Sequence, residues 1–426
     1  MASSRLRGIH IQMSSLRNPT TIILILALLQ VLCATYFLYI PNFYGINSIL
    51  FLIAGIGITA CLLNISPLQF APCKMINRQL LTKLIFIALL LPFSYQLARV
   101  IMDRTPLQIE YADMLPIMKV MSRRFLAGEW KHVYDPIPEI WNGFQSIYLP
   151  AMWLPFTAAL LFDFDLRWIT VCGIWLTVIL CLFPAWNKDW RPIVLIGGLV
   201  ILLAWLHFDH QNNVIRLTEE GVIFFYYAAL TVAIITSNPW LLGISVALCL
   251  LSRYSLLGWI PFAVLYLVMT RQHRFLLKTF ASSILVILLI LILPFGAKPL
   301  LFHLHFENAY VAQVPRVWRD NPEYFYHSLG LAKFFGPDHI QLLHLILTSG
   351  TFLIPLIFLF LVRKRILTQP NILLGGFQLS ITFFYNFIDV SYLYLFYTPV
   401  FVGLVIAGWS LAGKPVAASP SIQTLH

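Results

Sequence analysis

The sequence predicts an all-α polytopic membrane protein of about twelve transmembrane helices, with interfacial helices in its outer loops. Hydrophobic residues make up 60% of the 426 residues and charged residues only 11%, whereas soluble domains are about one quarter charged. Apolar runs near the roughly 20 residues that a helix needs to cross the hydrocarbon core recur along the chain. Short alternating segments of the kind that build membrane barrels are absent, so the spans are helical.

The charge pattern describes a membrane topology and excludes a nucleic-acid partner. The formal net charge is +11, but the basic residues cluster at the ends of the apolar runs, as they do in membrane proteins. We therefore expect the lipid bilayer, with some attraction for anionic lipid, as the partner of this charge. The six cysteines show no paired metal spacing, so neither a zinc site nor a disulfide framework is predicted.

The first part of the chain places its polar stretch on the outer face. A basic segment, 1–18, starts in the cytoplasm and is followed by a helical hairpin over 20–40 and 46–64. The next connection, 65–83, carries three basic residues and no acid, which indicates the cytoplasmic side. A third span, 84–101, then leads to the outer face.

Two later connections are also basic and free of acids, Arg271–Lys278 and Arg363–Arg365, and both are predicted to be cytoplasmic. The mixed-charge segment between them, 296–341, follows the span over 279–294 and is therefore a second outer loop. Two final spans, 372–388 and 391–411, return the chain to the cytoplasm.

The expected domain organisation is a single transmembrane domain over 19–413. Its first large outer loop covers 103–146, and the polar tail over 414–426 is predicted to be disordered and cytoplasmic, because its composition cannot bury a core.

The middle of the chain allows two topologies. Six apolar stretches lie between the first outer loop and Arg271, where an odd number of crossings is required. We favour a re-entrant or interfacial stretch at 192–206, which is short for a span, and this arrangement turns both 207–213 and Arg253 outward. If instead 241–269 is one long broken span, 207–213 faces the cytoplasm.

The first outer loop is a polar stretch between two apolar runs, and it holds the candidate catalytic acid. Over 111–126 the apolar residues recur at helical spacing, which predicts an amphipathic helix lying on the membrane surface. Asp113 lies in its first turn, where the helix dipole favours an ionised carboxylate. A charge that only stabilises a solvated helix is the alternative. The acids of the loop are Asp103, Glu110, Asp113, Glu129, Asp135 and Glu139.

Three features of this loop follow one another in the order of a known family. An early acid precedes the turn FLAGEWKHVYDP at 125–136, and IYLPAMWLPF at 147–156 then leads into the next apolar run. This pattern resembles the GT-C superfamily of polytopic glycosyltransferases, closest to its branch of mannosyltransferase-like enzymes that depend on polyprenol-phosphate sugars. The resemblance covers 110–156, and the rest of the chain only in hydropathy. Where the family often has Tyr-Pro-Pro, this chain has Tyr148-Leu149-Pro150.

The resemblance implies an enzyme that transfers a sugar from a polyprenyl-phosphate-linked donor to a glycan, lipid or protein acceptor with inversion. Asp113 would be the general base, with Asp103 and Glu110 as the next candidates. The active site would face the periplasm in a bacterial inner membrane, or the lumen of the endoplasmic reticulum in a eukaryote. The sequence identifies no definite cofactor, and a divalent cation bound with a second acid is an open alternative.

Several further residues are expected to bind substrate. The leaving lipid phosphate needs positive charge, and an arginine inside an apolar stretch, such as Arg253, is costly and usually functional. An arginine that extends to the interface is its alternative. The polar segment 207–213 is either a sugar-binding element or an ordinary connection. The expected substrate-binding residues are Glu110, Tyr134, Tyr148, His210, Gln211, Asn212, Arg253, Arg316 and Arg319.

Two other functions compete with the transferase. A transporter or flippase would place charges or broken helices near the bilayer midplane, and Arg253 fits that pattern. A glycan ligase or polymerase with a lipid-pyrophosphate donor would rely on arginines, for which Arg316 and Arg319 in the second outer loop are suited. The acids gathered in the first outer loop favour the transferase.

Overall fold

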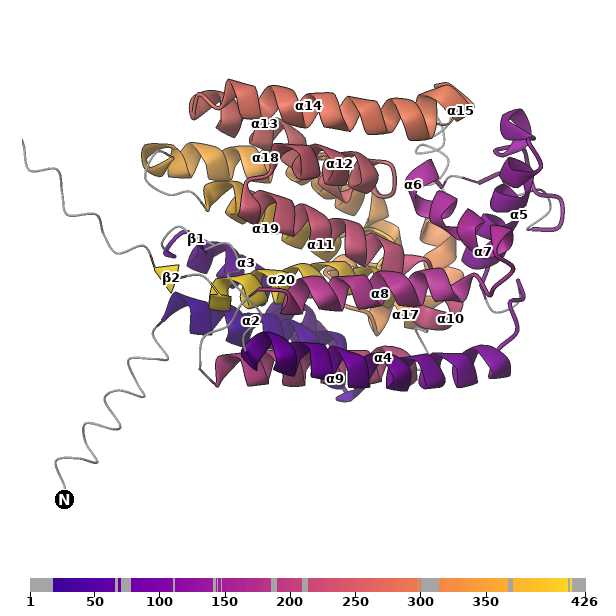
Figure 1. The fold of residues 1–426 in the computed structure, drawn as a ribbon, viewed down its shortest axis with the longest axis horizontal. Coiled ribbons are helices and arrows are strands. Elements are labelled where there is room, and N and C mark those ends of the chain that lie inside the picture. The colour runs from indigo at the N-terminus through magenta and orange to yellow at the C-terminus, as the bar shows by residue number, and fades with distance from the viewer. Residues whose placement is uncertain are drawn as a thin grey trace, which may run out of the picture.

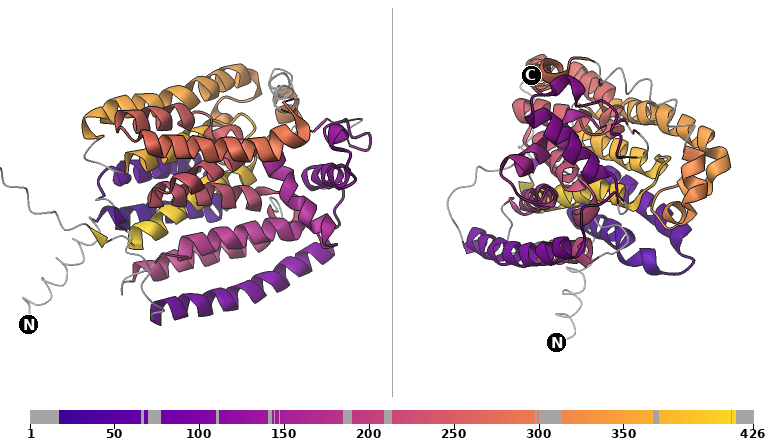
Figure 2. Two further views of the ribbon diagram at one scale, coloured as in Figure 1. Left: turned by 45° about the horizontal axis from the view of Figure 1, so that its top comes forward. Right: turned by 90° about the vertical axis from the view of Figure 1, so that its right-hand side faces the viewer.

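The protein is a bundle of helices that lie side by side along its long axis (Figures 1 and 2). The computed structural model describes residues 18–65, 68–69, 78–109, 112–140, 143, 145–146, 148–184, 190–208, 214–297, 299, 314–366, 371–412 and 414–415. Within these residues nearly every element is helical, so the prediction of an all-α protein is confirmed.

Six helical segments of the described chain are long and apolar enough to cross a membrane. They fit an integral membrane protein, while the total of about twelve spans stays a prediction. They are α2 (Pro19–Ala34) with η1 (Tyr36–Tyr39), α3 (Tyr44–Leu62), α9 (Arg191–Phe208), α14 (His273–Ile287) continued by η5 (Leu288–Ile292) and α15 (Leu293–Phe295), α18 (Ile340–Val362) with η7 (Pro337–His339) and η8 (Arg363–Arg365), and η9 (Leu393–Phe396) with α20 (Tyr397–Ala412).

Six apolar helical segments are shorter, at 10 to 17 residues. They are α6 (Pro150–Trp153) with η3 (Leu154–Phe156) and α7 (Thr157–Leu161), α8 (Arg167–Leu182), α11 (Glu220–Thr236), α12 (Pro239–Leu250), η4 (Tyr254–Leu256) with α13 (Trp259–Met269), and α19 (Ile372–Phe387).

The longest helix and several short elements complete the chain. A proline, Pro92, lies inside the longest helix, α4. The elements are α4 (Arg78–Arg104), α5 (Met114–Leu126), η2 (Trp130–His132), α10 (Val214–Leu217), helical residues at 314–320, α17 (Pro322–Tyr326), η6 (Ala332–Phe334), and the antiparallel strands β1 (Leu68–Gln69) and β2 (Lys414–Pro415). The predicted tail therefore begins in β2, and residues 416–426 lie outside the described part.

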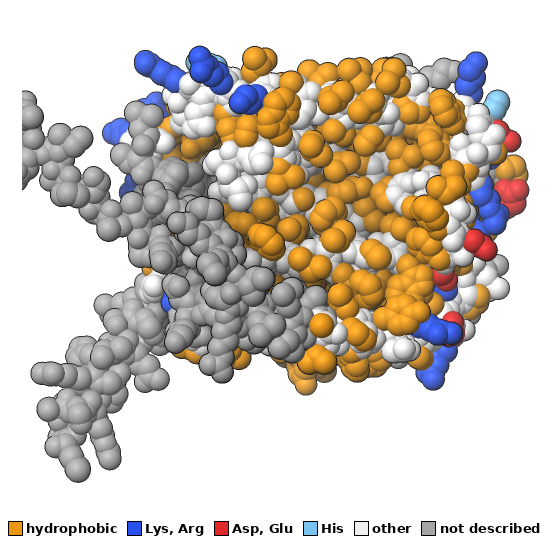
Figure 3. Space-filling view, viewed as in Figure 1, with side chains coloured by type: hydrophobic (Ala, Val, Ile, Leu, Met, Phe, Trp, Pro, Cys, Tyr) orange, Lys and Arg blue, Asp and Glu red, His pale blue; other side chains and the backbone are white. Residues whose placement is uncertain are grey.

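The surface has the polarity of a protein embedded in a bilayer. Figure 3 shows hydrophobic side chains across the middle of the visible face and charged side chains at its two ends. On that face the acidic side chains lie at the end that carries α5, α6 and α7, which we call the α5 end (Figure 1). On this face, an apolar band between polar ends is what the hydrocarbon core requires.

The bundle is built around α20, whose residues from Tyr397 to Leu411 are all buried. Two tryptophans, one on α9 and one on α20 itself, fix its position through hydrogen bonds. The indole of Trp205 on α9 donates to the Tyr397 hydroxyl at 3.0 Å, and Trp409 of α20 donates to the carbonyl of Leu180 on α8 at 3.0 Å. A helix buried on all sides needs such partners because no solvent reaches its polar groups.

The described parts of both predicted outer loops lie at the α5 end. Figure 1 places α15 and α17 there, and the ring of Phe295 on α15 packs edge-on against Tyr134 of the first loop, with centroids 5.6 Å apart. The helix α14 starts at the opposite end, where its basic first turn at His273 lies. The described parts of the two loops therefore lie towards one end of the bundle, and the side of the membrane that this end faces stays a prediction.

The expectation of a re-entrant stretch at 192–206 does not hold. The helix there, α9, begins at Arg191 and continues to Phe208, which makes it 18 residues long and apolar enough to span. The interrupted segment is Pro150–Leu161, which is divided into α6, η3 and α7 and lies beside α5 (Figure 1). The first piece begins at Pro150, and Pro155 is the second residue of η3; proline in the first turn favours a new helical start.

Candidate functional site

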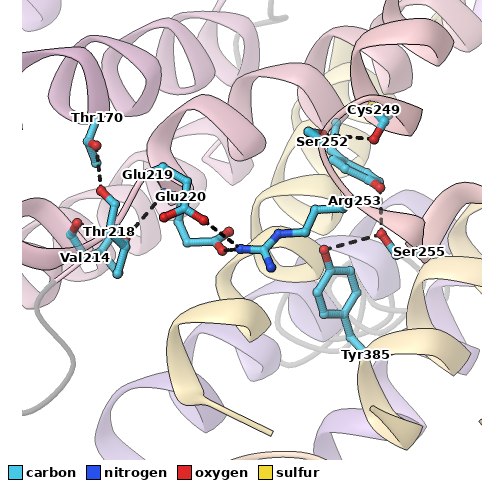
Figure 4. Close-up of polar contacts among 11 residues, drawn as sticks. Thr170, Val214, Thr218, Glu219, Glu220, Cys249, Ser252, Arg253, Ser255 and Tyr385 are labelled. Carbon is cyan, nitrogen blue, oxygen red and sulfur yellow. Dashed lines mark hydrogen bonds and ion pairs between the residues drawn. The ribbon is translucent and has the colours of Figure 1, made fainter. Parts of the chain in front are cut away.

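A contact between α8 and α11 fixes the position of two adjacent glutamates at the α5 end. A Cβ atom added to Gly221 on α11 would lie 1.9 Å from the carbonyl oxygen of Thr170 on α8, so only glycine permits this approach. The Thr170 hydroxyl also donates to the carbonyl of Thr218 at 2.6 Å. These contacts hold the start of α11, with Glu219 and Glu220, against α8 (Figure 4).

Arg253 reaches the two glutamates from the end of α12. Its backbone is extended, with φ −144° and ψ 146°, and its Nη2 donates to a carboxylate oxygen of Glu219 at 3.0 Å and to one of Glu220 (Figure 4). The Arg253 side chain is 23% exposed, whereas both glutamate side chains are 0% exposed. Arg253 is therefore the centre of a buried ion cluster with these two acids.

Hydroxyl groups surround the guanidinium on its other side. The Ser255 hydroxyl lies 2.6 Å from the Tyr227 hydroxyl and donates to the Tyr385 hydroxyl at 3.5 Å (Figure 4). The charge of Arg253 acts on Tyr385 and on Tyr394 of η9. The cluster thus lies among phenols contributed by α11, α19 and η9.

Asp113 belongs to the same site. It is the N-cap residue of α5, one position before the first turn in which it was expected, and its side chain makes no capping hydrogen bond. Burial raises the pKa of the Tyr148 phenol well above its usual value, the negative charges of Asp113 and Glu219 raise it further, and Arg253 opposes them. The charge of Asp113 also acts on Glu219. Tyr148 is therefore close enough to feel the charges of both the predicted base and the ion cluster.

The amphipathic helix that carries Asp113 is close to its prediction. It covers Met114–Leu126, and three residues of the expected apolar stripe, Ile117, Met118 and Met121, are fully buried. It ends at Gly128, whose φ of +77° is left-handed. The amide of Glu129 donates to the carbonyl of Arg124 at 2.9 Å. This is the glycine-closed helix end in which a left-handed residue reverses the chain.

Tyr134 stabilises the loop after α5. Its hydroxyl accepts a hydrogen bond from the indole of Trp153 at 3.3 Å, and its ring packs edge-on against Phe295. Burial raises the pKa of the Tyr134 phenol, and the hydrogen bond from Trp153 partly offsets that rise. The ring is engaged by aromatic neighbours from α6 and α15 in this structure.

Arg316 and Arg319 lie on the surface, each with an acidic partner. Arg316 is 86% exposed and lies 3.6 Å from Asp320. Arg319 is 65% exposed and donates to Asp338 at 3.2 Å. Exposed pairs of this kind contribute little energy. Nothing described connects these two arginines with the Arg253 cluster.

Four of the predicted site residues lie outside the described residues, namely Glu110, His210, Gln211 and Asn212. The description of the chain stops at Phe208 and resumes at Val214, the first residue of α10. Among the residues that the structure does describe, no group of three or more His, Cys, Asp and Glu side chains could hold a metal ion. The divalent-cation alternative therefore stays a prediction.

Glu219 and Glu220 are members of the site that were not among the residues predicted from the sequence. The position of Arg253 inside an apolar stretch could have indicated them, because a buried arginine requires a carboxylate partner. The partners lie 34 and 33 positions before it, a separation at which no local spacing rule applies.

The described residues include two further partly buried contacts between ionisable side chains. Arg167, at the start of α8, pairs with Asp165 and donates to the carbonyl of Thr105 at 2.6 Å, which joins α8 to the end of α4. Burial opposes ionisation of Asp165, but the hydrogen bonds and positive charge of Arg167 outweigh it and lower the pKa of the carboxyl. His344 lies 3.1 Å from Asp389 across α18 and the end of α19.

Comparison of the chain with protein-family models, with curated proteins and with solved structures gave no match.

Proposed function

We propose that this chain is a GT-C-like membrane glycosyltransferase that uses a polyprenyl-phosphate-linked sugar, with Asp113 as the general base. The observation that supports the proposal is the grouping of Asp113, Tyr148, Glu219 and Arg253 at one end of a bundle that carries an apolar band on the face in Figure 3. A lipid-linked donor reaches such a site from the bilayer, with its sugar at headgroup depth.

In the proposed reaction Asp113 takes the proton of an acceptor hydroxyl. The oxygen then attacks the anomeric carbon of the donor sugar from the side opposite the phosphate. The bond between that carbon and the phosphate oxygen breaks, and its electron pair leaves with the polyprenyl phosphate. General-base catalysis of this kind contributes about 10²- to 10⁴-fold, and a carboxylate beside Tyr148 and the Arg253 cluster suits the role.

The remaining residues of the site would position the reactants. Tyr148 keeps its proton because its pKa is raised, so its hydroxyl is available to donate a hydrogen bond to a sugar oxygen or to the leaving phosphate. Arg253 is the natural counter-charge for that phosphate, although it now contacts two glutamates. Arg316 and Arg319 are too exposed to provide a desolvated charge.

The test is transfer by the purified chain from polyprenyl-phosphate hexoses, mannose first, to a panel of alkyl glycosides. We expect Asp113→Asn to lose at least about 100-fold in rate. Asp163→Asn is the matched control, because Asp163 is exposed and its left-handed backbone, φ +52°, suits asparagine equally well. Transfer at the wild-type rate by Asp113→Asn would refute the role of this base.

A transporter is the second candidate, and the buried cluster of Glu219, Arg253 and Glu220 is the observation that favours it. Ionisable groups in the membrane often mark transport pathways. Proteoliposomes that move a lipid-linked sugar between leaflets without any transfer to an acceptor would support the transporter over the enzyme. Transfer from a lipid-pyrophosphate glycan, offered side by side with the monophosphate donor, would instead identify a ligase.

A further inference from the structure

The oxygens that Arg253 does not contact distinguish its cluster from an ordinary ion pair. Glu219 and Glu220 both direct one carboxylate oxygen at the same nitrogen, Nη2. The second oxygen, Oε2, of each glutamate is buried and has no hydrogen-bond partner among the residues that the structure describes. Buried polar atoms of this kind are rare in folded proteins, and each one calls for an explanation.

The charges of the cluster do not balance if both acids are ionised. Two carboxylates then meet one guanidinium, and an uncompensated buried carboxylate is so costly that it takes up a proton instead. Among the described residues, the other groups whose charges act on the cluster are the acid Asp113 and the phenols Tyr148, Tyr227, Tyr385 and Tyr394. None of them supplies a positive charge, and Asp113 adds a negative one.

Protein atoms enclose the two carboxylate oxygens that Arg253 does not contact. The Oε2 atoms are inaccessible to solvent, and the start of α11 cannot withdraw easily because Gly221 rests against the backbone of α8. We propose that Glu219 and Glu220 together bind one exchangeable proton, which makes the buried cluster with Arg253 electrically neutral. Two interacting acids of this kind titrate as a pair, not as separate residues.

This proton site would influence Asp113 whatever reaction the protein catalyses. Loss of the proton would place a second negative charge beside the Asp113 carboxylate, whose charge already acts on Glu219. Uptake of the proton would remove that repulsion. The local pH would thus change the electrostatic potential at the Asp113 carboxylate. The proposed proton site does not depend on the glycosyltransferase activity.

Infrared spectroscopy of the full chain in nanodiscs tests the proposal directly. We expect a band of one protonated carboxylic acid per chain at about pH 7, where exposed acids are ionised. The band should move to lower frequency in D₂O, and also when glutamate, but not aspartate, carries ¹³C in its carboxyl group. It should disappear in Glu219→Gln, in Glu220→Gln or in both, and should persist in the matched control Glu129→Gln, which changes an exposed acid.

Three results of the infrared experiment would each overturn the proposed proton site. Absence of the band in the labelled wild-type chain at about pH 7 would overturn the proposal even if neither glutamine variant folds. A band that ignores the glutamate label, or that survives in both single variants, would overturn it as well. Because no sugar donor is present, a negative result here is independent of any failure of the transfer assay.

Discussion

Arg253 and Glu219, 34 residues apart in the chain, are joined by a hydrogen bond of 3.0 Å between Nη2 and a carboxylate oxygen. The bond links the end of α12 to the start of α11 at a point where the glutamate is fully buried. It is the contact through which an arginine in an apolar stretch becomes part of the same site as Asp113.

Replacement of Arg253 by methionine should destabilise the fold strongly. Two buried carboxylates would lose their only cation among the described residues, and breaking a buried ion cluster from one side costs about 3–5 kcal/mol. Thermal unfolding in detergent measures the loss. The triple variant Arg253→Met, Glu219→Gln, Glu220→Gln should recover much of it, because it leaves no unpaired charge. Arg316→Met, at an exposed site, should change stability by less than about 0.5 kcal/mol.

Gly221→Ala should disrupt the contact between α8 and α11. The added methyl group would meet the Thr170 carbonyl oxygen at 1.9 Å, and overpacking typically costs about 1–3 kcal/mol or more. The start of α11 would move, so the variant should lose stability and transfer activity together. Gly197→Ala on α9 is the control, since nothing lies within 4 Å of its added Cβ. Equal melting temperatures for the two variants would contradict the close contact.

Tyr148→Phe and Tyr134→Phe should have opposite effects on activity and stability. If the Tyr148 hydroxyl binds a reactant, its removal should lower kcat/KM about tenfold, the equivalent of one hydrogen bond, with little change in the melting temperature. The Tyr134 hydroxyl instead accepts a hydrogen bond from Trp153 inside the loop. Its removal should therefore lower the melting temperature and leave kcat/KM nearly unchanged. A loss of activity confined to Tyr134→Phe would reverse the assignment.

Lys333 should make stability depend on pH above neutrality. Its ammonium donates to the carbonyls of Tyr44 and Ser328, and burial lowers its pKa to about 8. The unfolded chain keeps the proton up to about pH 10.4, so between these values it binds more protons than the folded chain. Stability from this residue therefore rises with pH through that window and is lost as the pH falls through about 8.

The pH dependence is measured as the difference in unfolding free energy between wild type and Lys333→Met, from about pH 7 to about pH 10. The wild type should gain stability relative to the variant as the pH rises. Lys131→Met, which removes an exposed lysine at the same end of the bundle, should follow the wild type throughout. A constant difference between wild type and Lys333→Met would exclude the lowered pKa.

Local patterns in the sequence predicted the features that depend on neighbouring residues. The spacing of Ile117, Met118 and Met121 predicted α5, because residues three and four apart lie on one face of a helix. The acid-free basic connections predicted that the two polar loops share one end. The interruption at Pro150–Leu161 was not recognised, because its apolar composition conceals three short helices with separate starts.

The sequence alone determined that charged side chains would be buried. The tertiary structure determined which of them pair with one another. An arginine at 253 inside an apolar stretch and two acids at 219 and 220 before another already required compensation, because unpaired ions are not stable away from water. Which ions met, and that Tyr148 and Asp113 would lie beside them, depended on how α8, α11 and α12 pack. That packing arises from contacts such as Gly221 against Thr170, between residues far apart in the chain, which no periodicity or local spacing encodes.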